Sequence, residues 1–272
     1  GFDTKEADAS ASVATSYFAS ESALPFKAPD FTQFSEDDYM QAFEQGMVIQ
    51  NAEIHAIIDN VDAPTFENTI VALEKSGRML GRVSRVFFMY TGTNTNERLD
   101  AINREVSPKL SAHSSSITLN SALFARVKAV YGEREALSLD AESAKLLEKT
   151  KEDMVKAGAE QTGDQRARVK AINTELSSLT TQFSQIVRNA TNDHPLVVET
   201  AEELKGLSEN QIEAAAAKAK ALGLDGQYAI AMQNTTQQPL LPELENRADR
   251  ERFFKLSYGR SDGTTSEFDT RM

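Results

Sequence analysis

The chain of 272 residues contains no cysteine and no tryptophan, and it has only three histidines, seven prolines and 13 glycines. The absence of cysteine excludes disulfide bonds, thiol catalysis and cysteine-ligated metal sites, but it does not decide the cellular compartment. Proline and glycine both interrupt helices. Their scarcity, together with the absence of tryptophan, therefore favours a helical protein.

Positive charge and long apolar runs are scarce as well. The chain has 29 Lys and Arg against 41 Asp and Glu, a net charge of −12 and a pI near 4.9. Nucleic-acid binding needs clustered Lys and Arg, so the charge argues against a nucleic-acid partner, and we attribute the acidity to solubility. No stretch approaches 18 consecutive apolar residues, which excludes a transmembrane helix.

The first 22 residues are rich in Ala, Ser, Thr and acidic residues and show no apolar period, which predicts a flexible leader over 1–22. The sequence shows no signal peptide, and it begins with glycine, which predicts a processed or engineered N-terminus. A polar leader of this length resembles the tether left when an export or lipoprotein signal is removed. We therefore predict a periplasmic or envelope-tethered protein. The alternative is a cloning scar with a disordered terminus on a cytoplasmic protein.

Apolar residues at helical spacing recur through residues 23–195 and predict helices in antiparallel hairpins or bundle layers. The predicted helix starts are the capping pair Ser35 and Asp38 and the N-cap residues Thr65, Asn120 and Asp140. A seven-residue repeat predicts one helix over Pro64–Tyr90, which buries Phe66, Leu73, Leu80 and Phe87. Gly77 falls within that stripe, and we consider two explanations: a neighbouring backbone passes close by, or the glycine is tolerated at the surface.

The longest apolar stripe runs through Val169, Ile172, Leu176, Leu179, Phe183, Ile186 and Ala190. Beyond it the pattern changes, because 196–200 and 228–232 are short and β-prone and predict a small β-element near residues 196–235. The fold class is thus mostly all-α. A helix is predicted from Asn246, and the final polar loop leads into the first turn of a new helix, so we expect a truncated domain over 196–272.

The residues that most often carry catalysis or bind metals form no complete constellation. His55, His113 and His194 lie in no H-E-x-x-H motif, and no two of them are four residues apart, so a structural role is preferred for each. We therefore predict no catalytic and no metal-ligating residue in this chain.

Two shorter patterns resemble catalytic motifs. Ser261 lies in GRSDG, which matches G-x-S-x-G, but a predicted helix rather than a strand precedes it, so we interpret the pattern as a turn. A serine hydrolase that uses Ser261 is a weaker candidate. Glu202 and Glu203 are interpreted as partners of a helix dipole rather than as a catalytic dyad.

The segment PTFENTIVALEKSG, followed by RVSRVFF and NTN, resembles the N-terminal half of bacterial peptidyl-dipeptidases. These enzymes are thimet-oligopeptidase-like zinc metallopeptidases of the M3 family. The resemblance covers about residues 22–271, because other stretches follow in the family's order, among them ALPFKAPDF, DDYMQAFEQGM, LLEKTKEDMVKAGA, ELSSLTTQFSQIV, QPLLPELENRADRERFF and FDTR. The shared order is more specific than any single stretch.

The resemblance implies a mostly helical enzyme in two halves, with a narrow channel that admits unfolded peptides. In the family, zinc is held by the histidines of H-E-x-x-H and a later glutamate, and dipeptides are removed from the C-terminus of the substrate. The zinc-binding half lies downstream of the FDTR region. No family catalytic residue can therefore be assigned to a position of this chain, and its substrate-binding residues are unknown. Residues 196–272 would be the start of the catalytic half.

Our first interpretation is the N-terminal, non-catalytic part of a zinc peptidyl-dipeptidase, which forms one wall of the substrate channel. It implies zinc in the parent enzyme but none bound by this chain, short unfolded peptides as substrates, and the missing catalytic half as partner. It also implies that an apolar or channel-facing strip is exposed when that half is absent. The alternative is a stand-alone helical binding or scaffold protein without catalysis.

Overall fold

The computed structural model describes residues 17–264 and 267–271, with the side chain of Asp193 excepted. The contacts between Cα atoms divide the chain into two compact units, residues 1–178 and 179–272, and each is described by itself. The division falls inside a long helix. The predicted domains, 23–195 and 196–272, stay a prediction.

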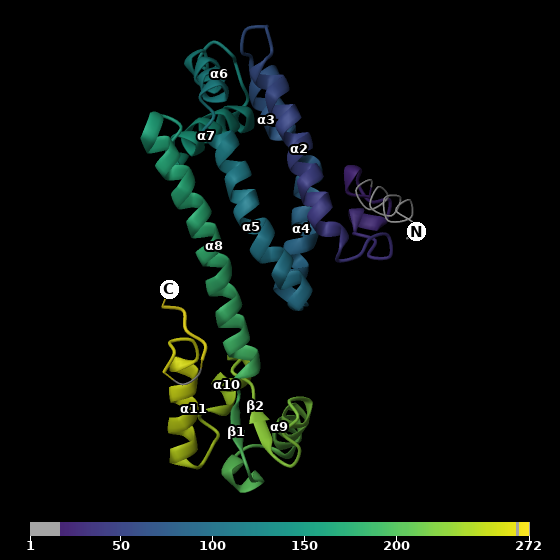
Figure 1. Ribbon diagram of the computed structural model, residues 1–272, viewed down its shortest axis with the longest axis vertical. Coiled ribbons are helices and arrows are strands. Elements are labelled where there is room, and N and C mark those ends of the chain that lie inside the picture. Colours follow the sequence, from purple (N-terminus) through teal and green to yellow (C-terminus); the bar gives the residue numbers. More distant parts are fainter. Residues whose placement is uncertain (1–16, 265–266, 272) are drawn as a thin grey trace, which may run out of the picture. The chain divides into compact units, whose positions relative to one another are not determined.

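The first unit is built from helices and short helical turns. In chain order these are η1 (Pro25–Lys27), α2 (Asp38–Ile58), the π-helical η2 (Phe66–Val71), α3 (Ala72–Lys75), α4 (Arg78–Thr93), α5 (Glu97–Thr118), α6 (Ser121–Gly132), α7 (Ala141–Ala157) and α8 (Gly163–Asp193), which continues into the second unit (Figure 1). None of the described helices is long and apolar enough to span a membrane.

Local hydrogen bonds explain where several of these helices begin. The Thr65 hydroxyl accepts from the Asn68 backbone N–H at 3.0 Å, and the carboxylate of Asp140 accepts from the Ser143 N–H at 2.8 Å. The side chain of Asn120 accepts from Leu123 N–H at 3.0 Å. These three predicted N-caps are confirmed. The predicted helix start at Ser35 is wrong, although the predicted pair of Ser35 and Asp38 does form.

The reason lies in the direction of the hydrogen bonds made by Ser35. Its hydroxyl and its backbone N–H both donate to the Asp38 carboxylate, at 2.8 and 2.7 Å. The hydroxyl therefore does not accept from a helix N–H, as an N-cap side chain does. Helix α2 begins three residues later, at Asp38.

The predicted single helix over Pro64–Tyr90 is wrong, because the helical conformation is interrupted at Ser76 and Gly77. Ser76 is extended, with ψ 156°, and Gly77 has φ 69° and ψ 21°, a left-handed conformation that favours glycine. Gly77 N–H donates to the Glu53 carboxylate at 2.7 Å instead of to a helical carbonyl. The hydrogen bond between Gly77 and Glu53, two residues that are distant in sequence, thus marks the end of α3 and the start of α4.

Gly77 is buried, so it is not a tolerated surface glycine. A Cβ atom at this position would overlap the side chain of Gln50, so the close neighbour is a side chain rather than a backbone. The close backbone approach occurs instead at Gly46, where an added Cβ would lie 3.0 Å from the Cα atom of Leu80. Gly46 thereby allows α2 and α4 to lie side by side (Figure 1).

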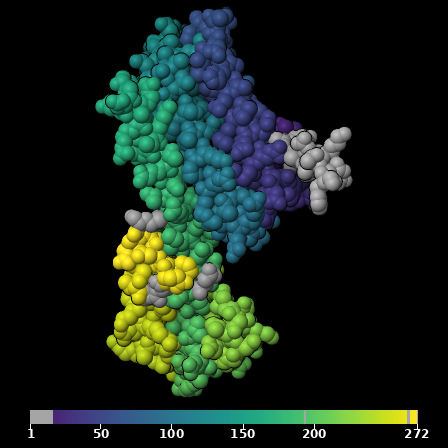
Figure 2. Space-filling view, viewed as in Figure 1, coloured from purple at the N-terminus to yellow at the C-terminus, as the bar shows by residue number. Residues whose placement is uncertain are grey.

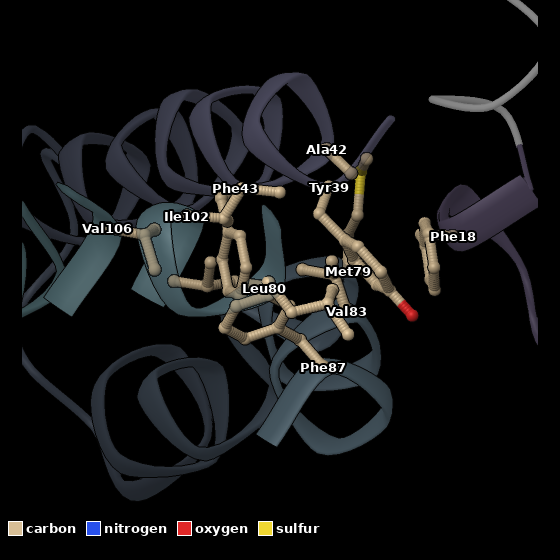
Figure 3. Close-up of a cluster of buried hydrophobic side chains, with 11 residues drawn as sticks. Phe18, Tyr39, Ala42, Phe43, Met79, Leu80, Val83, Phe87, Ile102 and Val106 are labelled. Carbon is tan, nitrogen blue, oxygen red and sulfur yellow. The ribbon is translucent and has the colours of Figure 1, made fainter. Parts of the chain in front are cut away.

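The first core lies between α2, α4 and α5, and Figure 3 shows its side chains pointing toward one another. Aromatic rings dominate the core, with Tyr39 and Phe43 from α2 around Phe87 of α4. Phe18 belongs to this core and is 1% exposed. The predicted flexible leader therefore does not include Phe18, while residues 1–16 lie outside the described part of the chain.

A second core of the same unit joins the C-terminal part of α2 to η2, α6 and α7. Its buried members are Ile54, Ile57, Phe66, Ile70, Leu123, Phe124, Val127, Val130, Leu147, Met154 and Ala159. Many of them recur at helical spacing in the sequence: Ile54 and Ile57 in α2, Phe124, Val127 and Val130 in α6, and Leu147 and Met154 in α7. Hydrophobic periodicity therefore predicted which faces of these helices are buried.

The second unit combines helices with a two-stranded antiparallel sheet of β1 (Leu196–Val198) and β2 (Tyr228–Ile230), in which Val197 pairs with Ala229. Around it lie η3 (Ala201–Leu204), α9 (Glu209–Ala221), α10 (Asn234–Leu240) and α11 (Arg247–Gly259). Leu196, Val198, Ile230, Met232 and Phe253 are buried in a core of their own. The predicted fold class, mostly all-α with a small β-element near 196–235, is confirmed.

Candidate functional site

The three histidines lie on different elements. His55 is exposed on α2, with its Nδ1 atom 3.9 Å from the carboxylate of Asp59, and His194 follows α8. His113 is half-buried on α5, with its Nε2 atom 2.8 Å from the Gln50 amide oxygen. Among the described residues, no three His, Asp or Glu side chains come together in a way that could hold a metal ion.

Burial lowers the pKa of His113 below its ordinary value of 6.5. The unfolded chain therefore takes up this proton more readily than the folded chain, and stability is lost as the pH falls through 6.5. We expect the free energy of unfolding of the first unit to fall between pH 7 and pH 5. The measurement is urea unfolding at each pH.

A pair of variants isolates the contribution of this one histidine. The loss of stability should be smaller in His113→Gln, whereas the exposed histidine variant His55→Gln should behave like the unchanged chain. An equal loss of stability in both variants would assign the pH dependence to other groups.

The other two candidate patterns occupy turns and caps. Ser261 follows helix α11, so this serine is not preceded by the strand that a nucleophile elbow requires. Its backbone carbonyl accepts from Thr270 N–H at 2.9 Å. Glu203 accepts from the backbone N–H of Thr200 at 2.9 Å, which is also the main reason that its pKa is lowered. The Glu203 carboxylate therefore caps η3 (Ala201–Leu204).

The most unusual surface of the described chain is one face of α8. Ile172, Leu176, Leu179 and Phe183 are 37%, 54%, 36% and 48% exposed, respectively. Their spacing of four, three and four residues places them on the same side of the helix. We call these four residues the apolar face of α8. The helix itself lies partly at the surface drawn in Figure 2.

Polar groups, in contrast, connect α8 to the rest of the first unit. The Ser111 hydroxyl of α5 donates to the Asn173 carbonyl at 2.9 Å, and the Asn173 side-chain amide donates to the Ser115 hydroxyl at 3.2 Å. An amphipathic helix normally turns its apolar side inward and its polar side to water. Here polar residues make the internal contacts while large apolar residues are exposed. This arrangement is typical of a helix that has a second packing partner.

Periodicity predicted the stripe but not its exposure. The default interpretation of such a stripe is a buried core, and it is wrong for these four residues. Ala190, at the end of the same stripe, is buried. The sequence contained no signal that separates the covered end of the stripe from the exposed part, because both parts have the same spacing.

Comparison with curated proteins gives relatives that the chain matches over most of its length. It is 42% identical over 254 residues to a dipeptidyl carboxypeptidase of Escherichia coli strain K12, which covers 93% of this chain and 37% of that protein. It is 40% identical over 250 residues to a dipeptidyl carboxypeptidase of Salmonella typhimurium, covering 92% of this chain and 37% of that protein.

A more distant relative is an oligopeptidase A of Haemophilus influenzae, 27% identical over 230 residues, which covers 84% of this chain and 33% of that protein. No family model matches the chain. The chain thus spans little more than a third of the length of these relatives.

Proposed function

We propose, from the premise that this chain matches a fragment of an M3 peptidase, that it is the N-terminal, non-catalytic part of a zinc metallopeptidase. The parent enzyme would remove C-terminal dipeptides from unfolded peptides. This chain would form one wall of the substrate channel. The names of the two dipeptidyl carboxypeptidases that the chain matches support the peptidase class, and the order of the family stretches supports the N-terminal position.

The observation that carries the proposal is the apolar face of α8. Fully burying a large apolar side chain contributes about 1.5–3 kcal/mol relative to full exposure. The four side chains are 36–54% exposed, so roughly half of that stabilisation is not realised in this chain. The relatives extend well beyond the length that this chain covers. The remaining part of such a protein offers a surface to cover this face, and a helical wall of a larger enzyme needs such a contact.

Zinc would belong to that remaining part. The sequence of this chain contains no H-E-x-x-H motif, which in the M3 family supplies two zinc ligands and the glutamate that activates water. Bound zinc supplies a water molecule of lowered pKa for attack on the peptide bond. The role proposed for the residues of this chain is to shape the channel and to exclude folded proteins.

The experiment compares the 272-residue chain with the protein encoded by the complete reading frame of the parent gene. Both are incubated with zinc and a peptide that has a free C-terminus, and dipeptide release is followed by mass spectrometry. We expect release by the parent protein and none by the chain alone. Dipeptide release by the chain alone, or a parent frame without H-E-x-x-H, would contradict the proposal.

The exposed face also predicts how the isolated chain behaves in solution. We expect concentration-dependent self-association, measured by sedimentation velocity, because apolar faces pair in the absence of their partner. The double variant Leu176→Asn and Phe183→Asn should weaken association at least tenfold.

The matched control removes apolar side chains that are exposed elsewhere. Val48 and Val61 are 62% and 98% exposed, and the double variant Val48→Asn and Val61→Asn should associate like the unchanged chain. A strict monomer at high concentration would contradict the role assigned to the α8 face.

The compartment stays a proposal. We infer a periplasmic or envelope-tethered parent protein from the polar leader, with the cytoplasm as the alternative. Fractionation of cells that express the complete reading frame distinguishes the two.

A further inference from the structure

A hollow of about 810 Å³ lies in the first unit, beside α4 and the segment that precedes α2. This volume is within the range of ligand pockets in proteins, roughly 300–1,000 Å³. Four cationic side chains line it, against two carboxylates: Arg78, Arg82, Arg85, Lys27, Glu21 and Glu74. The hollow is therefore cationic in a chain whose net charge is −12.

The cationic side chains of the hollow differ in whether they already have a hydrogen-bond or ion-pair partner. Lys27 lies 3.5 Å from the carboxylate of Glu21, and Arg82 donates to the backbone carbonyl of Phe18 at 2.7 Å. Within the described part of the chain, Arg78 and Arg85 make no hydrogen bond or ion pair through their side chains. Desolvation is the main cause that lowers the pKa of Arg82; the charge of Glu21 opposes this shift, and the charges of Arg85 and Arg78 add to it.

Arg78 is the first residue of α4, and the Glu53 carboxylate binds the N-terminus of this helix by accepting from Gly77 N–H at 2.7 Å. Arg78 lies in the first turn of that helix, which contains no acidic residue. The partial positive charge of a helix N-terminus disfavours a cation there, and the Glu53 carboxylate offsets part of this effect.

An exposed aromatic side chain lies at the same hollow. Phe26 is fully exposed and lines the hollow. Phe26 and Lys27 both have a backbone φ of 58°, a left-handed conformation that residues other than glycine rarely adopt. Strained backbone of this kind persists only where the surrounding structure holds it, and it is frequent at ligand sites. Phe26 therefore offers an apolar surface beside the free guanidinium groups.

We propose that this hollow binds an acidic peptide segment, with Arg78 and Arg85 pairing with carboxylates and Phe26 contacting an apolar side chain. Guanidinium groups bind carboxylates through two parallel hydrogen bonds. Seven residues of helix separate the two arginines by about 10 Å along the axis. This separation suits a ligand with several carboxylates better than a single small anion. The site does not depend on the peptidase assignment.

The test uses the 272-residue chain and a pentapeptide with four glutamates around one phenylalanine, acetylated and amidated at its ends. The blocked ends prevent recognition of a terminal carboxylate from contributing. Isothermal titration calorimetry is carried out at low and at high salt. We expect binding that weakens at high salt and is at least tenfold weaker for the same peptide with glutamine in place of glutamate.

Two double variants locate the site. Arg78→Gln with Arg85→Gln should weaken binding at least tenfold. Arg168→Gln with Lys170→Gln removes two exposed positive charges from α8, and it should bind like the unchanged chain. Phe26→Ala should weaken binding without altering its salt dependence.

Three results would overturn the proposal. The first is equal binding of the glutamine peptide. The second is an equal loss of affinity in both double variants, which would indicate a general charge effect. The third is binding of inorganic phosphate that needs both arginines while the acidic peptide does not bind. None of these results bears on dipeptide release by the parent protein.

Discussion

Replacing Phe87 with alanine is expected to lower the free energy of unfolding of the first unit by about 3–5 kcal/mol. The Phe87 side chain is fully buried, and its ring packs edge-on against the rings of Tyr39 and Phe43, with centroids 5.0 and 5.2 Å apart. Truncation removes the transfer free energy of the ring and leaves a cavity whose walls belong to packed helices. Edge-to-face aromatic contacts are lost as well. Urea unfolding followed by circular dichroism measures the change.

The neighbouring phenylalanine provides the control. Phe88 lies on the same helix and is 40% exposed, so Phe88→Ala has the same helix propensity change but removes much less buried surface. Because the Phe88 ring also packs edge-on against Phe87, with centroids 5.2 Å apart, we expect a smaller but measurable loss of about 1–2 kcal/mol. If the two variants lose equal stability, the first core does not lie between α2 and α4 as described.

The helix N-caps could be predicted from the sequence, because their hydrogen bonds involve residues that are close in the chain. The N-caps Thr65, Asn120 and Asp140 accept hydrogen bonds from residues three positions ahead, and such bonds need no information about tertiary structure. The buried faces of α2, α6 and α7 followed from periodicity for the same reason. A polar residue at the right offset marked these three helix starts, whereas the same signal at Ser35 did not mark the start of α2.

The break at Ser76 and Gly77 depends on residues far away in the sequence. Glu53 accepts from Gly77 N–H, and the Gln50 amide donates to the Ser76 hydroxyl at 3.3 Å. The apolar repeat continues across the break, since Leu80 and Phe87 keep their phase with Phe66. Periodicity therefore predicted a single helix, while side chains of α2 divide it into two.

The candidate sites were harder to predict for a different reason. The period of Leu176, Leu179 and Phe183 defines a face of α8, but it does not identify what covers that face. Arg78 and Arg85 match no motif, and their significance depends on a hollow that α4 forms with a segment more than 40 residues earlier. Burial and unpaired charge are properties of tertiary structure, so only the three-dimensional arrangement reveals them.

Replacing Gly206 with alanine is expected to destabilise the second unit by about 2–5 kcal/mol, the combined cost of left-handed strain and overpacking. Gly206 has φ 102°, and an added Cβ atom would overlap the backbone carbonyl oxygen of Glu243. The two segments cannot easily separate, because Glu245 N–H donates to the Lys205 carbonyl at 2.8 Å. The clash is with backbone rather than with a flexible side chain, so relief requires movement of the loop that leads into α11.

A second glycine separates the two causes. Gly226 has φ 84°, and none of the described atoms lies within 4 Å of a Cβ atom built there, apart from its immediate surroundings along the chain. Gly226→Ala therefore introduces left-handed strain alone, which costs about 1–2 kcal/mol. Thermal unfolding of both variants should show the larger loss for Gly206→Ala, because the overlap with the Glu243 backbone adds to the left-handed strain. Equal losses would mean that the loop carrying Glu243 yields freely, and that the close approach at Gly206 does not constrain the fold of this unit.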